Sequence, residues 1–281
     1  MPSRLRHPLL DERRRPDRLS RLAYYGRSIP RLLRELDAPH RTVGLFLGVT
    51  RPDGRAVRVR DRDLLFHVRS REDVWSIKET LLDGFYDRPG LRPTTGWSIV
   101  DVGGGIGDFA VDVAARDPTA RVHVFEPDAA ARRLAELNVA ANGLANVTLH
   151  PEALAGRTGT VQLDETAADP LRRQAGTGTG TGGRAVPALD LGDALERAGI
   201  DDCDLLKLDC EGAEYEILAG AGKTLARVRR LVGEFHELGP GRDLRALATF
   251  LADSGYDARW TRSYVQPHTG YFWAVRQAHA P

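Results

Sequence analysis

A short hydrophobic run leads into a cluster of glycines near residue 100. Residues 99–102 are apolar apart from Asp101, and Gly103, Gly105 and Gly107 follow them. Glycines let a backbone turn tightly and approach a ligand closely, while the free N–H groups of a following helix point at whatever is bound. The segment predicts a strand, a loop and a helix that bind a nucleotide cofactor, although a tight turn without a ligand would use similar residues.

The charge of this loop indicates which cofactor it binds. Its pattern is G-x-G-x-G, whereas loops that hold the pyrophosphate of a dinucleotide have the pattern G-x-G-x-x-G. Asp101 stands at the tip of the predicted strand, where an anion repels phosphate but suits an ammonium or a sulfonium. No Lys or Arg occurs between Trp97 and Ala115, so the sequence offers no nearby side chain to neutralise two phosphates. The loop therefore favours S-adenosylmethionine over NAD.

The length and charge of the whole chain exclude several classes of protein. With 281 residues, the chain can form one large domain or one domain with an extension, and we expect the second arrangement. The formal net charge of +1 argues against a general nucleic-acid binder. Cys203 and Cys210 form neither a disulfide framework nor a zinc site. Because no apolar run has the length of a signal peptide core or a membrane span, we expect a cytoplasmic protein that does not bind membranes.

The first 90 residues are predicted to form an extension of helices and a β-hairpin. Residues 1–37 are rich in Arg and have apolar residues at helical spacing, which predicts one or two amphipathic helices. Residues 43–49 and 55–60 are predicted to be extended runs joined by a turn, with a third short strand at 64–68 and a helix at 72–82. We interpret this extension as a cap, a lid over the acceptor or a contact between two copies of the chain.

Residues 91–281 show a regular alternation of strands and helices, which predicts a doubly wound, mostly parallel sheet. The second strand ends at Glu126, which follows Gly107 by 19 residues and can accept hydrogen bonds from both ribose hydroxyls, unless it is a solvated loop residue. Pro127 begins the next helix. Glu152 and Ala153 follow the third strand and are expected beside the adenine.

Three further segments complete the predicted domain. Residues 256–260 and 271–275 are predicted to form an antiparallel pair that closes the sheet at its C-terminal end. A Gly/Thr repeat at 175–183 has no strand that leads directly into it and no helix after it, so it is predicted to be a flexible excursion rather than a phosphate loop.

Polar residues also follow the fourth and fifth predicted strands. Asp209 comes directly after residues 205–208, and Glu234 and His236 end the strand at 228–235. The strand order should bring these side chains together at the carboxyl edge of the sheet, where open α/β sheets bind ligands. In one mechanism His236 is the general base, and activity rises through a pKa near neutrality. In the other, Asp209 and the acidic strand end hold Mg²⁺. We favour the first, because three ligands are fewer than the six that Mg²⁺ takes.

Several segments together resemble the FkbM-type S-adenosylmethionine-dependent methyltransferases. They are DVGGGIGDF at 101–109, VFEPD at 124–128, and DLLKLDCEGAEYEILAG at 204–220 with a following GEFHE. The resemblance covers residues 73–237, and it departs at Gly104 and Gly105, where members often have Ala-Asn. It implies a class I methyltransferase (Rossmann-like) fold with a seven-stranded sheet, and usually O-methylation of a sugar, a polyketide or another natural product. N-methylation of peptides also occurs in relatives and stays an alternative.

Two rival functions remain beside methyl transfer. Short-chain NAD(P)-dependent oxidoreductases need Tyr-x-x-x-Lys, and none of the seven tyrosines has a Lys four residues on. A catalytically silent partner that keeps the cofactor fold would have the same motifs. The predicted catalytic residues are His236 and Asp209, with no metal ligand. The predicted cofactor-binding residues are Asp101, Gly103, Gly105, Gly107, Glu126, Pro127, Glu152, Ala153 and Asp209.

Overall fold

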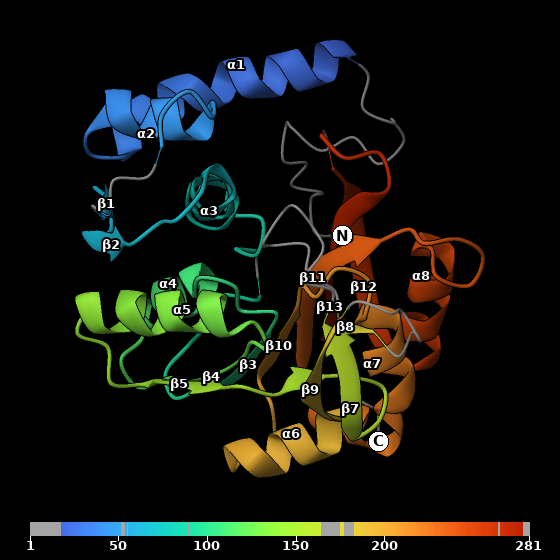
Figure 1. The fold of residues 1–281 in the computed structure, drawn as a ribbon. Coiled ribbons are helices and arrows are strands. Elements are labelled where there is room, and N and C mark those ends of the chain that lie inside the picture. The colour runs from blue at the N-terminus through green and yellow to red at the C-terminus, as the bar shows by residue number, and fades with distance from the viewer. Residues whose placement is uncertain are drawn as a thin grey trace.

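A seven-stranded sheet forms the centre of the molecule (Figure 1). The computed structural model describes residues 18–51, 54, 56–88, 90–163, 175–176, 183–263 and 265–277. From one edge to the other, the strands are β12 (Tyr256–Arg262), β13 (Thr269–Arg276), β11 (Arg230–His236), β10 (Leu205–Leu208), β3 (Ser98–Val102), β4 (Arg121–Phe125) and β5 (Val147–His150).

The sheet is parallel except at β13, which pairs antiparallel with both β11 and β12. Both the mostly parallel sheet and the antiparallel C-terminal pair predicted from the sequence are confirmed. This is the class I methyltransferase arrangement that the resemblance implied.

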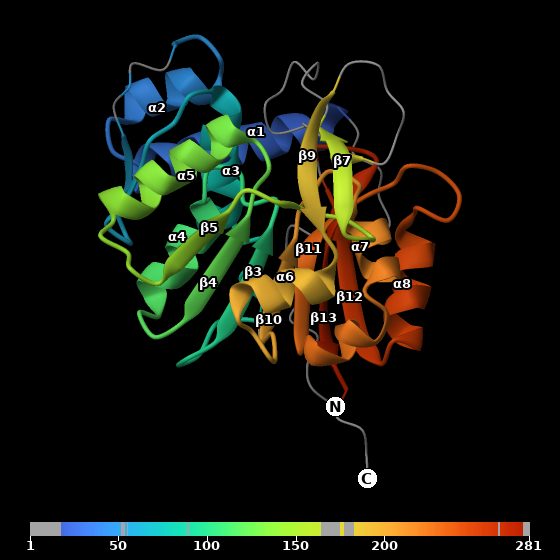
Figure 2. The same cartoon turned by 60° about the horizontal axis from the view of Figure 1, so that its bottom comes forward.

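Helices cover both faces of the sheet (Figures 1 and 2). α4 (Asp108–Arg116) and α5 (Ala129–Ala141) cover one face, and α6 (Leu191–Ala198), α7 (Glu214–Gly220) and α8 (Leu244–Asp253) cover the other. Side chains alternate along a strand, so Val100 and Val102 pack in the core with α6 to α8, while Ile99 packs with α4. The same alternation directs Asp101 toward the face of α4.

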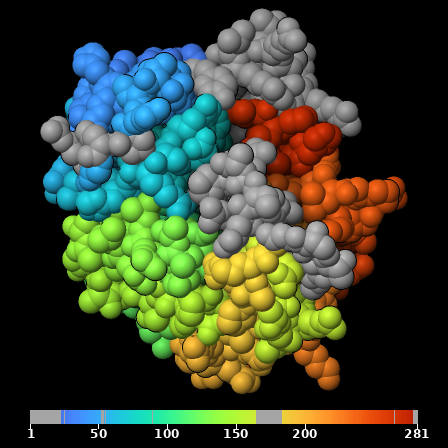
Figure 3. Space-filling view, viewed as in Figure 1, coloured from blue at the N-terminus to red at the C-terminus, as the bar shows by residue number. Residues whose placement is uncertain are grey.

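The N-terminal residues form a further layer over α4 and α5. It contains α1 (Arg18–Glu35), α2 (Pro39–Phe46), the hairpin of β1 (Val57–Val59) and β2 (Leu64–Phe66), and α3 (Arg71–Ile77), which continues into the π-helix η1 (Lys78–Leu82). Figure 3 shows this layer in blue and cyan against the green α5. Leu36, Phe66 and Ile77 share one buried cluster with Val111 of α4 and Val139 of α5. The proposed domain boundary near residue 90 therefore crosses a shared hydrophobic core.

Part of the prediction for this layer is wrong. Residues 43–49 were expected to be extended, but α2 runs from Pro39 to Phe46, and the hairpin pairs β1 with β2 instead. Thr42, Leu45 and Phe46 are buried on one helical face, which is a spacing of three and four residues. Pro39 in the first turn also favours a helix start. The alternation of apolar residues in the short run concealed this helical face.

A small second sheet lies beside the main one and has the strand order β6 (Ala153–Leu154), β9 (Arg184–Leu189), β7 (Gly159–Leu163) and β8 (Ala175–Gly176). Figure 2 shows β7 and β9 rising from the carboxyl side of the main sheet. Most of the predicted Gly/Thr excursion, residues 177–182, and the loose start at residues 1–17 lie outside the described residues. Within the described ranges, no helix combines the length and the apolar character that a membrane span requires.

Candidate active site

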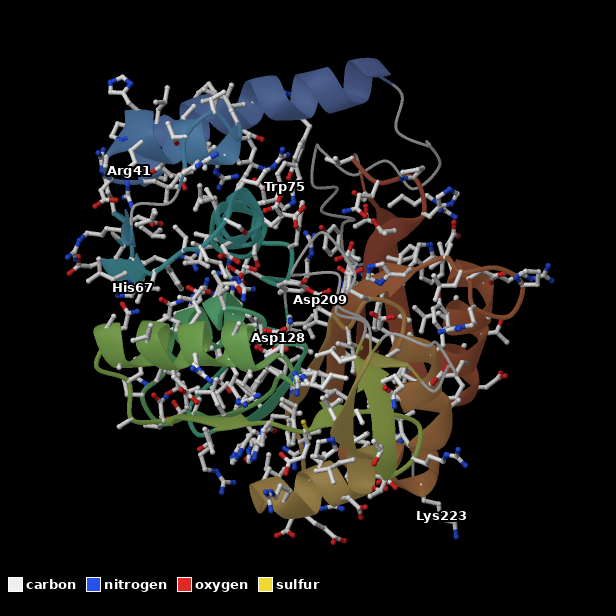
Figure 4. All side chains as sticks on the ribbon, in the orientation of Figure 1. Arg41, His67, Trp75, Asp128, Asp209 and Lys223 are labelled. Atoms are coloured by element: carbon white, nitrogen blue, oxygen red, sulfur yellow. The ribbon has the colours of Figure 1, made fainter. Side chains whose placement is uncertain are left out.

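A cavity lies at the carboxyl ends of the central strands, beneath α3 and η1. Figure 4 labels Trp75, Asp128 and Asp209, which line it from α3, the start of α5 and the tip of β10. The sheet edge supplies Gly103, Gly105, Glu126, Pro127, Ala153, Lys207, Asp209, Glu211 and Glu234, and the N-terminal layer supplies Trp75, Ser76, Glu79, Thr80 and Tyr86. The cavity is therefore built by the two parts of the chain together.

The glycine loop after β3 packs directly against the tip of β10. Gly103 has φ +71°, which L side chains rarely adopt, and a Cβ atom there would lie 1.9 Å from the backbone oxygen of Asp209. Gly107, with φ 79°, begins α4. Glycine at position 103 is therefore what allows the cofactor loop and Asp209 to meet.

Glu126 is held at the cavity by backbone hydrogen bonds. One carboxylate oxygen accepts from the N–H of Gly105 at 2.9 Å, and the other accepts from the N–H of Asp128 at 2.7 Å. Burial raises its pKa to about 7, although these two hydrogen bonds act in the opposite direction. The carboxylate is thus fixed at the end of β4, where the sequence predicted a ribose ligand.

Asp101 lies beneath the loop and does not line the cavity. Its carboxylate forms an ion pair with a buried lysine. In the parallel pairing of β3 with β10, Lys207 is in register with Asp101, and its Nζ lies 2.9 Å from Asp101 Oδ1. Lys207 Nζ also donates to the carbonyl of Gly103 at 3.1 Å. Although burial acts to lower the pKa of Lys207, Asp101 and Asp209 outweigh it and raise that pKa.

The sequence argument that no cation lies near the glycine loop is therefore wrong, since Lys207 comes from another strand. A signal for it was present in the sequence. Lys207 and Asp209 are two residues apart on a predicted strand, and side chains at that spacing point to the same face.

Acidic side chains in and around the cavity form hydrogen bonds with tyrosines. Tyr86 Oη donates to Asp209 Oδ2 at 2.7 Å, and Tyr271 Oη donates to Glu79 Oε1 at 3.1 Å. Burial raises the pKa of Glu79 to about 8. Burial and the nearby Asp209 also hold the pKa of Glu234 well above its usual range. No motif in the sequence pointed to Glu79 or Tyr86, which precede the glycine loop.

His236 ends β11 as predicted, but it does not line the cavity. Its Nε2 lies 3.2 Å from a carboxylate oxygen of Glu211, and its Nδ1 lies 3.3 Å from one of Glu214. Burial alone would lower the pKa of His236, but the hydrogen bonds to Glu211 and Glu214 outweigh burial and raise it to about 11. The imidazole is therefore protonated at neutral pH and has no lone pair free to accept a proton. A general base that titrates near neutrality does not fit this geometry.

The His236 ion pairs predict a particular pH dependence of stability. The pKa of His236 is about 11 in the folded protein and 6.5 in a free histidine, so protonation of His236 stabilises the fold. This contribution is fully present below about pH 6.5. This contribution is lost as the pH rises from there toward 11, by at most about 1.4 kcal/mol per pH unit. We expect the difference in unfolding free energy between the wild type and His236→Gln to shrink between pH 7 and pH 9 in urea titrations. A difference that stays constant would contradict the assignment of these ion pairs.

The other predicted site residues divide between the cavity and its surroundings. Gly103, Gly105, Glu126, Pro127, Ala153 and Asp209 line the cavity, whereas Asp101, Gly107, Glu152 and His236 do not. Glu152 instead accepts a hydrogen bond from Arg197 at 2.8 Å. Within the part of the chain that is described, no group of three or more His, Cys, Asp or Glu side chains is placed to hold a metal ion.

Comparison with curated proteins gives two related sequences. The 31-O-demethyl-FK506 methyltransferase FkbM of Streptomyces tacrolimicus is 28% identical over 206 residues, which cover 61% of this chain and 78% of that protein. The AMB antimetabolite synthetase AmbE of Pseudomonas aeruginosa is 27% identical over 253 residues, which cover 74% of this chain. The chain spans only 12% of the length of AmbE.

Solved structures with similar folds have low sequence identity. The METTL16 MTase domain has a TM-score of 0.49 and 13% identity, with 90% of this chain and 91% of that chain covered. Precorrin-6y C5,15-methyltransferase from Geobacter metallireducens GS-15 has a TM-score of 0.46 and 14% identity, with 78% and 97% covered.

The family follows from the sequence match together with the fold. The sequence profile of the methyltransferase FkbM domain matches residues 101–258, from the glycine loop to β12. This range is more than half of the chain, and it contains the strand tips that surround the cavity. The chain belongs to the FkbM methyltransferase family.

Proposed function

We propose that the cavity binds S-adenosylmethionine through Gly103, Gly105, Glu126 and Ala153, and that the protein methylates a hydroxyl oxygen of a natural product or sugar. The bound cofactor supplies an electrophilic methyl group on a positively charged sulfur. Glu126 is suited to accept hydrogen bonds from two ribose hydroxyls, because each of its oxygens is already oriented by a backbone N–H. Asp209 and Glu234 lie on the acceptor side.

The charges in the cavity support a cationic cofactor. Glu79, Glu211 and Glu234 all line it, and Lys207 is already shared between Asp101 and Asp209. Burial and neighbouring carboxylates raise the pKa values of Glu79 and Glu234, so both side chains are mainly protonated at neutral pH, and a bound cation would favour their charged forms. A ligand with a sulfonium and an ammonium group provides such a cation, whereas a pyrophosphate has the opposite effect.

The observation that supports O-methylation is the Asp209 carboxylate at the tip of β10, which lines the cavity. A hydroxyl must lose its proton as the new bond to carbon forms, and a positioned base contributes about 10² to 10⁴-fold. Asp209 Oδ2 accepts from Tyr86, which leaves lone pairs on the carboxylate for the acceptor proton. Trp75, Glu79 and Tyr86 of the N-terminal layer lie over the same cavity, where they can position the acceptor and exclude water.

The names of the two relatives support a natural-product acceptor. One is a methyltransferase of 31-O-demethyl-FK506, and the other is an antimetabolite synthetase. We propose a small hydroxylated acceptor rather than nucleic acid. We also propose that no divalent ion is needed, because Lys207 and Tyr86 already contact Asp209, and the reaction in EDTA tests this.

Transfer of a labelled methyl group tests the proposed reaction. The protein is incubated with S-adenosylmethionine that carries a ¹³C-methyl group and with a panel of hydroxylated polyketides, sugars and peptides. Carbon NMR of the product then separates a methoxy group from an N-methyl group. We expect the label on oxygen. A product with the label on nitrogen would support the peptide or amine alternative and contradict O-methylation.

Replacing Glu126 should weaken cofactor binding selectively. Loss of a charge-assisted contact costs about 1.5 to 3 kcal/mol, or roughly ten to a hundredfold in affinity, so Glu126→Ala should bind S-adenosylmethionine that much more weakly. Glu152→Ala is the matched control, because Glu152 also follows a strand but contacts Arg197 outside the cavity. Isothermal titration measures both variants. Equal affinity of folded Glu126→Ala and wild type would mean that the ribose lies elsewhere.

A further inference from the structure

A second cavity lies between α1, the turn after β1, η1 and the segment that follows η1. Its volume is about 710 Å³, and it shares no lining residue with the cavity described above. Three of these segments, all but η1, contribute arginines that line it, namely Arg31, Arg34, Arg60, Arg62, Arg88 and Arg92. This concentration of guanidinium groups in one cavity has no role in the proposed methyl transfer.

The carboxylates in this second cavity already have basic partners. Glu35 pairs with Arg34 at 2.6 Å, and Asp83 pairs with Lys78 at 2.5 Å. Asp87 pairs with Arg92 at 2.7 Å, and Asp61 lies 3.8 Å from Arg62. Lys78 is itself outside the lining of this cavity. The acidic residues therefore leave part of the arginine charge without a counterion.

Among the arginines of this cavity, Arg88 most clearly lacks hydrogen-bond partners for its charged group. Its side chain is buried, with 7% of the residue exposed, and within the described residues its Nε and Nη2 have no hydrogen-bond partner. The guanidinium carbon lies 4.9 Å from the centre of the Trp273 ring, within the range of a cation–π contact. Burial lowers the pKa of Arg88. A buried charged donor without a partner is costly, which indicates that a ligand completes it.

Arg60 adds a second donor that is free of carboxylates. Its Nη1 donates a hydrogen bond to the backbone oxygen of Arg34 at 3.3 Å, and no acidic side chain among the described residues forms an ion pair with it. Guanidinium groups present forked N–H donors that match oxyanions with several equivalent acceptors. Leu81 and Leu82 form an apolar wall of the same cavity. A compact tetrahedral oxyanion can use donors that come from several directions.

We propose that this cavity binds a phosphate group, held by Arg88 and Arg60, at a site distinct from the methyl-transfer cavity. The phosphate can be a free ion or part of a phosphate ester. Asp87 next to Arg88 forms ion pairs with Arg92 and Arg116, so it only partly offsets the charge of the Arg88 guanidinium. This inference goes beyond the proposed function and does not depend on the identity of the methyl acceptor.

Titration of the full chain with inorganic phosphate tests the site. The protein is purified without phosphate and titrated by calorimetry at constant ionic strength, with potassium chloride as the control. We expect saturable binding of phosphate and none of chloride. Arg88→Gln should weaken it by about tenfold or more, because a charge-assisted hydrogen bond is lost. Arg259→Gln is the control, since Arg259 is exposed, paired with Asp257 and outside the lining of this cavity, and it should change affinity by less than about threefold.

Thermal unfolding gives an independent readout that does not require methyl transfer. Phosphate should raise the melting temperature of the wild type but not that of Arg88→Gln. If Arg88→Gln does not fold, Arg60→Gln replaces it in both measurements. Titration with glucose 6-phosphate shows whether the natural ligand is a phosphate ester or the free ion. Tighter binding of glucose 6-phosphate than of inorganic phosphate indicates an ester, and weaker binding indicates the free ion. Equal responses to phosphate and chloride, or equal phosphate affinity of Arg88→Gln and wild type, would overturn the proposal.

Discussion

Asp209→Asn is expected to lower turnover by about 10² to 10⁴-fold, because an amide cannot take the acceptor proton as a carboxylate can. The substitution keeps the size of the side chain, and an amide oxygen can still accept the hydrogen bond from Tyr86. Lys207 keeps Asp101 as its ion-pair partner at 2.9 Å, so the fold should survive. Turnover is measured with the acceptor that the labelled-methyl assay identifies.

Two controls separate chemistry from binding in this experiment. Tyr86→Phe removes the hydrogen bond to Asp209 but leaves the carboxylate, so its loss of turnover should be much smaller. Calorimetric titration of Asp209→Asn with S-adenosylmethionine checks that the cofactor still binds. Turnover of Asp209→Asn within about threefold of wild type would exclude Asp209 as the base. A large loss in Glu234→Gln alone would then assign the role to Glu234.

Lys207→Met is expected to lower the unfolding free energy by about 3 to 5 kcal/mol, because it leaves the buried Asp101 charge without a partner. Asp101 is fully buried, and neither of its carboxylate oxygens has a hydrogen-bond partner among the described residues apart from this ion pair. The substitution also removes the donor to the carbonyl of Gly103. Urea unfolding of the purified variant measures the loss.

The double variant Asp101→Leu with Lys207→Met tests the physical cause. Replacing both members of a buried ion pair by apolar residues is often neutral, so the double variant should recover more than half of the lost stability. If Lys207→Met alone costs less than about 1 kcal/mol, the ion pair is not what holds the cofactor loop against β10.

The sequence was sufficient for the architecture of residues 91–281. Apolar runs bounded by glycine and acidic residues mark β3, β4 and β10, and the order of strands and helices follows from their alternation. The common location of Glu126 and Asp209 at the cavity could be predicted, because parallel strands place their carboxyl ends at one edge of the sheet. In both cases, the position of the residue at the carboxyl end of its strand determines the edge of the sheet at which it lies.

The remaining features depend on contacts between distant segments. The pairing of Lys207 with Asp101 depends on the register of β10 against β3, which no local pattern encodes. His236 could be located at a strand end, but its protonation depends on Glu211 and Glu214, which come from another segment. Tyr86 reaches Asp209 only because the N-terminal layer packs over the sheet edge. Local patterns therefore identified the edge of the sheet that lines the cavity, but not the residues that set the protonation states of its side chains.

Isothermal titration of the wild-type protein with S-adenosylmethionine, followed by a parallel titration with NAD, tests the central claim most directly. The claim is that an acidic cavity around Glu126 and Asp209 binds a cationic cofactor. We expect saturable binding of one S-adenosylmethionine per chain and no saturable heat with NAD. Saturable binding of NAD, or no binding of S-adenosylmethionine by the folded protein, would contradict it.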